Sequence, residues 1–362
     1  MNKAKKLPLG PLMIDIEALE LSSLDRERLC HPLIGGIILF ARNYQSREQL
    51  SHLTAEIRLL RSPPLLIAID HEGGRVQRCR EGFARLPAMR RLGELWERNP
   101  ENAVIMAREL GYVLAVELRA CGVDFSFTPV LDLDWGRSAV IGDRSFHADP
   151  QVVTQLAGAL IEGLHAAGMG ACGKHFPGHG WVEADSHVAI PVDNRSLAEL
   201  APDLEPYRHL TLNAVMPAHV IYPQIDARPA GFSPVWIKKL REEFAFDGVV
   251  FSDDLSMEGA SVAGDIAGRA TAAWNAGCDM LLVCNSPSAV GELLSHWQPA
   301  PDPERRRRIE ALLPAGELTI LSGGNPRYLA ALAMVSNMVL SVWLHTVNKL
   351  PSLKPEPRKI NV

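Results

Sequence analysis

The segment DGVVFSDD, at residues 247–254, is a short run of branched apolar residues that ends in two carboxylates. A run of this length without polar alternation is typical of a strand buried on both faces of a parallel sheet. Seven similar runs occur along the chain: PLMIDI (11–16), GGIILF (35–40), LLIAID (65–70), VDFSFTPV (123–130), GMGACGKH (168–175), NAVMPAH (213–219) and CDMLLVCN (278–285). Together these runs predict eight buried strands.

Segments of helical composition lie between the runs, such as SREQLSHLTAEIRLL (46–60) and ENAVIMARELGYVLAVELRACG (101–122). Strand and helix that alternate eight times predict an α/β fold, a single (β/α)8 TIM barrel. A doubly wound open sheet is the alternative, but no GxGxxG motif follows an early strand to favour it. We therefore expect residues 1–300 to form the barrel.

Residues 301–362 are predicted to form a C-terminal helical extension that packs on the barrel and ends in a flexible tail. Its residues 328–344 are apolar but are interrupted by Ser336, Asn337 and Ser341, which argues against stable membrane insertion. We expect a helix packed on the barrel rather than an interfacial or dimer-forming helix. The four arginines at 305–308 are interpreted as a solvated helix face.

The composition of the chain limits its possible functions. It has 362 residues, 47% of them hydrophobic, a formal net charge of -5 and a pI near 6.2, so it is globular and lacks the basic field of a nucleic-acid-binding protein. Pro8, Gly10 and Pro11 interrupt the N-terminal segment where an export signal would be apolar, which predicts a cytoplasmic protein. Six scattered cysteines without a CxxC pair predict reduced, mostly buried thiols.

Ionisable and polar residues gather at one end of the predicted strands. In a (β/α)8 barrel the carboxyl ends of the strands and the loops after them form the active-site face. The residues that stand there are Asp70, Lys174, His175, His219, Asp253, Asp254 and Asn285. Their shared position predicts a functional site at this face of the barrel.

Two pairs of residues could carry acid–base or nucleophilic chemistry. Asp253 and Asp254 are adjacent, so alternation along the strand would point one toward the barrel axis as nucleophile or base, while the other caps a helix or binds a backbone N–H. Asp185 and His187 are one residue apart in the dense stretch KHFPGHGWVEADSH (174–187). In an extended loop the carboxylate would orient the imidazole and favour its protonated form.

The remaining polar residues of the predicted site suit a hydroxyl-rich ligand. Asp70 is followed by HEGGRVQR, in which Gly73 and Gly74 permit a tight turn and the arginines bring rigid donor groups. Arg144, Lys174 and His175 supply further donors. A pocket of many directional hydrogen-bonding groups predicts recognition of a sugar.

Five ordered motifs carry a resemblance to a known family: IDHEGGRVQR (69–78), VIGDRSF (140–146), KHFPGHG (174–180), ADSH (184–187) and FSDDLSM (251–257). In this order they closely resemble the signature segments of glycoside hydrolase family 3 β-N-acetylglucosaminidases of the NagZ type. The resemblance covers about residues 10 to 290. It implies a cytoplasmic, exo-acting, retaining glycosidase of peptidoglycan recycling.

The resemblance also implies a role for each matching residue. Asp253 would be the nucleophile that forms a covalent glycosyl-enzyme, His187 the acid/base and Asp185 the group that orients it. The terminal N-acetylglucosamine would be held by five residues: Asp70, Arg78, Arg144, Lys174 and His175. The implied substrate is a muropeptide in which N-acetylglucosamine is linked to 1,6-anhydro-N-acetylmuramic acid. No cofactor or metal is implied, and we expect no nucleic-acid partner and a monomer or weak homodimer.

The chain departs from the family in two respects. His71 stands where members commonly have glutamine, and fewer than 80 residues follow the eighth predicted strand, where larger relatives carry a second domain. Three alternatives stay open at this point. They are a β-N-acetylglucosaminide phosphorylase, a metal-dependent hydrolase that uses His175, His179, His187 and Asp185, and a non-catalytic sugar-binding protein.

Overall fold

The computed structural model describes residues 5–183, 190–314 and 325–347, with side chains to Met338 in the last segment. Within these residues the barrel strands form a five-stranded and a three-stranded parallel sheet. In chain order the strands are β2 (Leu12–Ile14), β3 (Ile34–Leu39), β5 (Leu66–Ile69), β8 (Phe125–Ser126), β9 (Cys172–Phe176), β10 (Ala214–Pro217), β13 (Val249–Val250) and β14 (Leu281–Val283). Each lies within or overlaps one of the eight predicted runs, so this prediction is confirmed.

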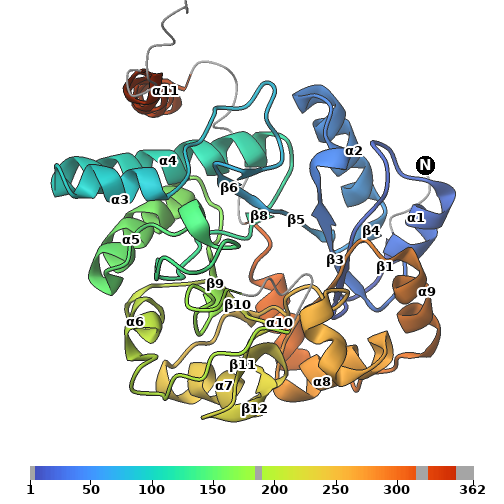
Figure 1. The fold of residues 1–362 in the computed structure, drawn as a ribbon. Helices are drawn as coiled ribbons and strands as arrows, with labels where there is room; N and C mark the ends of the chain where they lie inside the picture. The colour runs from blue at the N-terminus through green and yellow to red at the C-terminus, as the bar shows by residue number, and fades with distance from the viewer. Residues whose placement is uncertain (1–4, 184–189, 315–324, 348–362) are drawn as a thin grey trace, which may run out of the picture.

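Two short bridges join these sheets into a closed barrel. The larger sheet has the order β14-β2-β3-β5-β8 and the smaller has the order β13-β10-β9. Val130 pairs with Lys174 at one junction, and Phe251 pairs with Met280 at the other, both in parallel register. The strands therefore follow one another around the barrel in sequence order, which is the predicted (β/α)8 topology (Figure 1).

Helices surround the strands on the outside of the barrel (Figure 1). They are α1 (Ser23–Leu29), α2 (Arg47–Leu59), α3 (Arg90–Trp96), α4 (Pro100–Ala120), α5 (Pro150–Ala166), α6 (Ala201–His209), α7 (Pro234–Lys238), α8 (Ile266–Ala276) and α9 (Pro287–His296). Several of these helices have an N-cap side chain that accepts a backbone N–H group, such as Ser46 in α2 and Asp149 in α5. Single-turn helices are η1 (Ala41–Asn43), η2 (Gly142–Arg144), η3 (Ala230–Phe232), η4 (Lys239–Glu243) and η5 (Glu258–Ala263).

Three small pairs of strands lie outside the barrel wall. β1 (Lys5–Lys6) pairs with β4 (Arg61–Ser62), β6 (His71–Gly73) with β7 (Val76–Gln77), and β11 (Ile221–Tyr222) with β12 (Asp226–Pro229). The β6–β7 hairpin turns at Gly73 and Gly74, whose φ angles of 114° and 56° favour glycine. This hairpin directly follows β5, so it brings the 71–78 segment over the mouth of the barrel.

Aromatic side chains fill the barrel interior beneath that mouth. Phe125, Phe127 and Phe251 are fully buried, and their ring centroids lie 5.0 to 5.9 Å apart. The Nζ atom of Lys174 lies 6.0 Å from the ring centroid of Phe127. The apolar layer thus forms a dry floor under the polar groups at the strand ends. The six cysteines are free, and all but Cys30 are buried, as expected.

The helix α10 (Pro303–Glu310) corrects one expectation. Arg305 binds the carbonyl oxygens of Trp274 and Cys278 at 2.9 Å, and its guanidinium carbon lies 3.8 Å from the Trp274 ring centroid. Arg308 binds Asp279, whose side chain is fully buried, at 3.1 Å. The prediction of a solvated face is therefore wrong for these two arginines, because their stems and donors fasten α10 to the barrel.

The helix α11 (Pro326–Val347) lies against α4 (Figure 1). Ala331 and Val335 are fully buried there, and Arg327 pairs with Glu109. Within the described residues, no helix combines the length and the hydropathy that crossing a bilayer requires. The predicted tail at 348–362 lies outside the described residues, and the boundary at residue 300 stays a prediction.

Candidate active site

A pocket of about 450 Å³ opens at the carboxyl ends of the barrel strands. Its wall includes most of the polar residues that strand position had singled out: Asp70, Lys174, His175, Asp253, Asp254 and Asn285. His219 is buried beneath them, with its Nε2 atom 3.1 Å from the carbonyl oxygen of Asp254. The geometry therefore brings the strand-end residues of the sequence together at one cavity.

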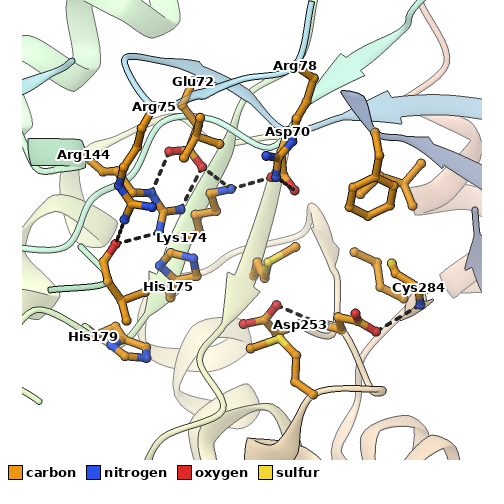
Figure 2. Close-up of a pocket in the computed structure, with 18 of the residues that line it drawn as sticks. Asp70, Glu72, Arg75, Arg78, Arg144, Lys174, His175, His179, Asp253 and Cys284 are labelled. Carbon is orange, nitrogen blue, oxygen red and sulfur yellow. Dashed lines mark hydrogen bonds and ion pairs between the residues drawn. The ribbon is translucent and has the colours of Figure 1, made fainter. Parts of the chain in front are cut away.

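The two adjacent aspartates after β13 have different environments. Asp253 faces the pocket, and its Oδ1 atom accepts the backbone N–H of Asp254 at 2.8 Å (Figure 2). Asp254 accepts the backbone N–H groups of Ser256 and Cys284 and the hydroxyl of Ser256. Burial raises the pKa of Asp254 to about 6, against those hydrogen bonds, which lower it. Asp254 thus fixes the corner between β13 and β14, as expected for one member of the pair.

A buried ionic network forms the opposite wall of the pocket (Figure 2). Lys174 Nζ lies 2.8 Å from Oδ1 of Asp70 and 2.6 Å from Oε1 of Glu72. Arg144 binds both oxygens of Glu72 at 2.8 Å. Arg78 completes the group, 3.8 Å from Oδ2 of Asp70. The predicted sugar-binding residues Asp70, Arg78, Arg144 and Lys174 are therefore neighbours, with Glu72 at their centre.

Sequence reasoning missed Glu72 although a signal was present. Glu72 stands two residues beyond Asp70, on the same side of an extended chain. Burial favours a raised pKa for Glu72, but the attraction of Arg144 and Lys174 outweighs it and holds the pKa well below its ordinary value. Burial likewise opposes the charge of Lys174, and Asp70 and Glu72 raise its pKa above the ordinary value. Both groups are therefore charged at neutral pH.

A second missed carboxylate, Asp132, organises the histidines of the pocket. Its Oδ2 atom lies 2.7 Å from Nδ1 of His175, and Oδ1 accepts the backbone N–H of His179 at 2.6 Å. Burial would raise the pKa of Asp132, but His175 and His179 lower it below its ordinary value. Among the described residues, Asp132 engages Nδ1 of His175, which leaves Nε2 as the nitrogen that can meet a ligand. The place of Asp132 just after the fourth predicted strand was the available signal.

His71, the departure from the family pattern, lies behind the pocket rather than in its wall. Its backbone N–H binds the hydroxyl of Ser126 at 3.1 Å, and its ring centroid lies 5.7 Å from that of Phe83. Burial foremost, and Arg78 and Arg80 in addition, lower the pKa of His71 to about 3. A neutral imidazole therefore stands behind Asp70. Asp185 and His187, the predicted acid–base pair, lie outside the described residues.

The sequence matches the Glycosyl hydrolase family 3 N terminal domain over residues 12–306. The chain belongs to glycosyl hydrolase family 3. A "Beta-hexosaminidase" of Bordetella avium is 60% identical over 327 residues, covering 87% of this chain and 92% of that protein. Another from Nitrosospira multiformis is 54% identical over 340 residues, covering 92% and 97%.

Solved structures of the family agree with the barrel described above. NagZ from Neisseria gonorrhoeae in complex with N-trifluoroacetyl-D-glucosamine has a TM-score of 0.87 and 51% identity, with coverage of 92% of this chain and 99% of that one. Such identity over nearly the whole length of both chains identifies this family 3 protein as a glycoside hydrolase of the β-hexosaminidase type. It acts on glycans, and the resemblance seen in the five motifs is confirmed.

Proposed function

We propose that the protein is an exo-acting, retaining β-N-acetylglucosaminidase that acts in peptidoglycan recycling. Its substrate is a muropeptide in which a terminal N-acetylglucosamine is linked to 1,6-anhydro-N-acetylmuramic acid. The enzyme works in the cytoplasm, as a monomer or weak homodimer, and needs no cofactor. The observation that carries the proposal is the position of Asp253, across the pocket from a fixed set of sugar-binding groups.

The position of Asp253 in the pocket favours it as the nucleophile. Asp70 and Glu72 are bound to Lys174, and Glu72 also to Arg144. Asp254 is engaged by backbone and hydroxyl donors. The carboxylate of Asp253 accepts the backbone N–H of Asp254 at 2.8 Å and faces the cavity at the end of β13. Retaining hydrolysis requires such a carboxylate beside the anomeric carbon, where it forms the covalent glycosyl-enzyme.

The acid/base role falls to His187, oriented by Asp185. The first step needs a proton on the leaving oxygen, and the second needs a base for the attacking water. An imidazole can serve both steps near neutral pH, and an adjacent carboxylate favours its protonated form. These two assignments rest on the ADSH motif.

The opposite wall supports binding of one terminal sugar. Asp70 accepts hydrogen bonds from hydroxyl groups, while Arg78, Arg144, Lys174 and His175 donate to hydroxyl and carbonyl oxygens. Close ion pairs fix Asp70, Lys174 and Arg144 before the ligand arrives, which reduces the entropy lost on binding. A pocket of about 450 Å³ lies at the small end of the range for ligand sites. This size supports exo action on a single terminal residue.

Hydrolysis of p-nitrophenyl N-acetyl-β-D-glucosaminide tests the proposal, with proton NMR to identify the anomer released first. We expect the β-anomer, a loss of more than about 1,000-fold in Asp253→Asn and of about 100-fold in His187→Ala. Asp143→Asn is the matched control, because Asp143 is exposed beside the mouth and does not line the pocket. Near-normal turnover of Asp253→Asn, or release of the α-anomer, would overturn the mechanism.

Two further measurements separate the finer parts of the proposal. Added phosphate should leave the rate unchanged, whereas a phosphate-dependent rate with release of N-acetylglucosamine 1-phosphate would establish the phosphorylase instead. Incubation with the 1,6-anhydro muropeptide should release free N-acetylglucosamine and the 1,6-anhydro-N-acetylmuramoyl peptide in equal amounts. Cleavage of internal linkages in longer glycans would contradict exo action.

A further inference from the structure

Arg78 depends on its backbone for its position in the pocket. Its guanidinium is 3.8 Å from Asp70 and 5.8 Å above the ring of Phe40, both loose contacts. The Nε atom of Arg78 is buried and has no hydrogen-bond acceptor among the described residues. Because these contacts at the guanidinium are weak, the position of the Arg78 side chain depends on the backbone conformation of residues 77–79.

The backbone around Arg78 is fixed by the amide of Gln77. Its Nε2 atom donates to the carbonyl oxygens of Cys79 at 3.1 Å and Ala84 at 2.8 Å, and its Oε1 atom accepts the backbone N–H of Leu86. One buried side chain thus ties both ends of the segment 77–86 together. A displacement of Ala84 would therefore be transmitted to Cys79 and to its neighbour Arg78.

Ala84 in turn is held by a buried carboxylate on α4. Its backbone N–H donates to Oε2 of Glu117 at 2.9 Å. The other oxygen of Glu117 accepts the hydroxyl of Tyr328 on α11 at 2.8 Å and lies 3.4 Å from Arg47 on α2. Only 2% of Glu117 is exposed, so its charge depends on these donors rather than on water.

We propose that Tyr328 and Glu117 are positioning residues, through which the C-terminal helix α11 holds residues 77–86, called here the wall segment because its Arg78 lines the pocket, and thereby places Arg78 for the sugar. This inference rests on the role of Arg78 in the proposed function. Burial raises the pKa of Glu117 above its ordinary value, and the bonds from Tyr328 and Ala84 oppose that rise. Without the Tyr328 hydroxyl, the carboxylate must recruit another donor, and the wall segment shifts with it.

A second side chain of α11, that of Arg327, provides a control for a general loosening of this helix. Arg327, the preceding residue, binds Glu109 on α4, with Nη2 to Oε1 at 2.8 Å. Among the described residues, the hydrogen bonds of this pair join α11 to the same neighbour and do not involve the wall segment. Comparison of Tyr328→Phe with Arg327→Met therefore separates a specific effect on the pocket from a general loosening of α11.

The experiment measures kcat and KM for p-nitrophenyl N-acetyl-β-D-glucosaminide, together with the inhibition constant of N-acetylglucosamine. Tyr328→Phe should raise both KM and the inhibition constant about fivefold, which a lost bond to a charged group can explain. Its kcat should stay within a factor of about two, since the reacting groups are untouched. Arg327→Met should leave both constants unchanged even if its melting temperature falls.

Arg78→Lys distinguishes failure of this inference from failure of the proposed function. If Arg78→Lys raises the inhibition constant and Tyr328→Phe does not, the positioning role is wrong and the sugar site stands. An equal rise in Tyr328→Phe and Arg327→Met would also overturn the positioning role. If Arg78→Lys leaves both constants unchanged, the assignment of Arg78 to the sugar is wrong, and the inference fails with it.

Discussion

At the scale of single residues, His71 links the site to the acid stability of the protein. Its pKa of about 3 in the folded state lies below the ordinary value of 6.5, because the ring is fully buried near Arg78 and Arg80. Between these two values the unfolded chain binds a proton that the native protein excludes. Stability is therefore lost as pH falls below about 6.5, and it is intact above that pH.

His71→Gln should remove this loss, since glutamine does not titrate. The wild type should lose about 2 kcal/mol of unfolding free energy relative to the variant between pH 7 and pH 5. Urea denaturation of both proteins at the two pH values measures this difference in unfolding free energy. Other titrating groups contribute equally to both proteins, so their effects cancel. An equal decline in the two proteins would mean that His71 is protonated in the native state.

At the scale of elements, α10 shows how a basic helix becomes part of the barrel. Arg308 reaches the buried Asp279, which also binds Arg241 and the backbone N–H of Val250 on β13. Arg307 binds the exposed residues Asp247 and Glu304. Arg308→Met should therefore lower the free energy of unfolding by about 2 kcal/mol. Arg307→Met should lower it by less than about 0.5 kcal/mol. Equal denaturation midpoints for the two variants would show that the Asp279 pair contributes nothing.

The elements also show which features the sequence could predict. Buried strands such as β3 and β5 can be predicted from the sequence because both of their faces are apolar. Each therefore appears in the sequence as a short run of branched apolar residues. The prediction was wrong for Arg305 and Arg308, because four adjacent charges look solvated until the acceptors are known. Those acceptors, Asp279 and the carbonyls of Trp274 and Cys278, come from another part of the chain. Pairing of this kind leaves no local pattern.

At the scale of the whole molecule, barrel closure explains why most of the site was predictable. Parallel strands in sequence order bring all their carboxyl ends to one face, so Asp70, Lys174 and Asp253 had to meet. Glu72 and Asp132 were missed although each lies two residues beyond a predicted strand, because the sequence alone does not show that the chain carries their side chains back toward the pocket. The coupling of α11 to Arg78 was equally hidden, since it passes through backbone groups that any sequence has.

Closure also predicts how a ligand at the mouth affects the whole protein. The groups of the pocket come from strands on both sides of the barrel, so unfolding the barrel destroys the site. N-acetylglucosamine at about 100 times its dissociation constant should therefore add about 2.7 kcal/mol to the unfolding free energy, a rise of about 4 °C in melting temperature. Differential scanning calorimetry with and without the sugar measures this shift.

Substitutions in the pocket should separate the sugar-induced rise in melting temperature from catalytic activity. Asp253→Asn should keep most of it, because the wall proposed to bind the hydroxyl groups of the sugar is unchanged. Lys174→Met should lose it, because Asp70 then loses its close cation and Glu72 keeps only Arg144. Its melting temperature without sugar should also fall, since breaking a buried pair costs about 3 kcal/mol. An undiminished sugar-induced shift in Lys174→Met would show that the ionic wall supports the barrel without binding the ligand.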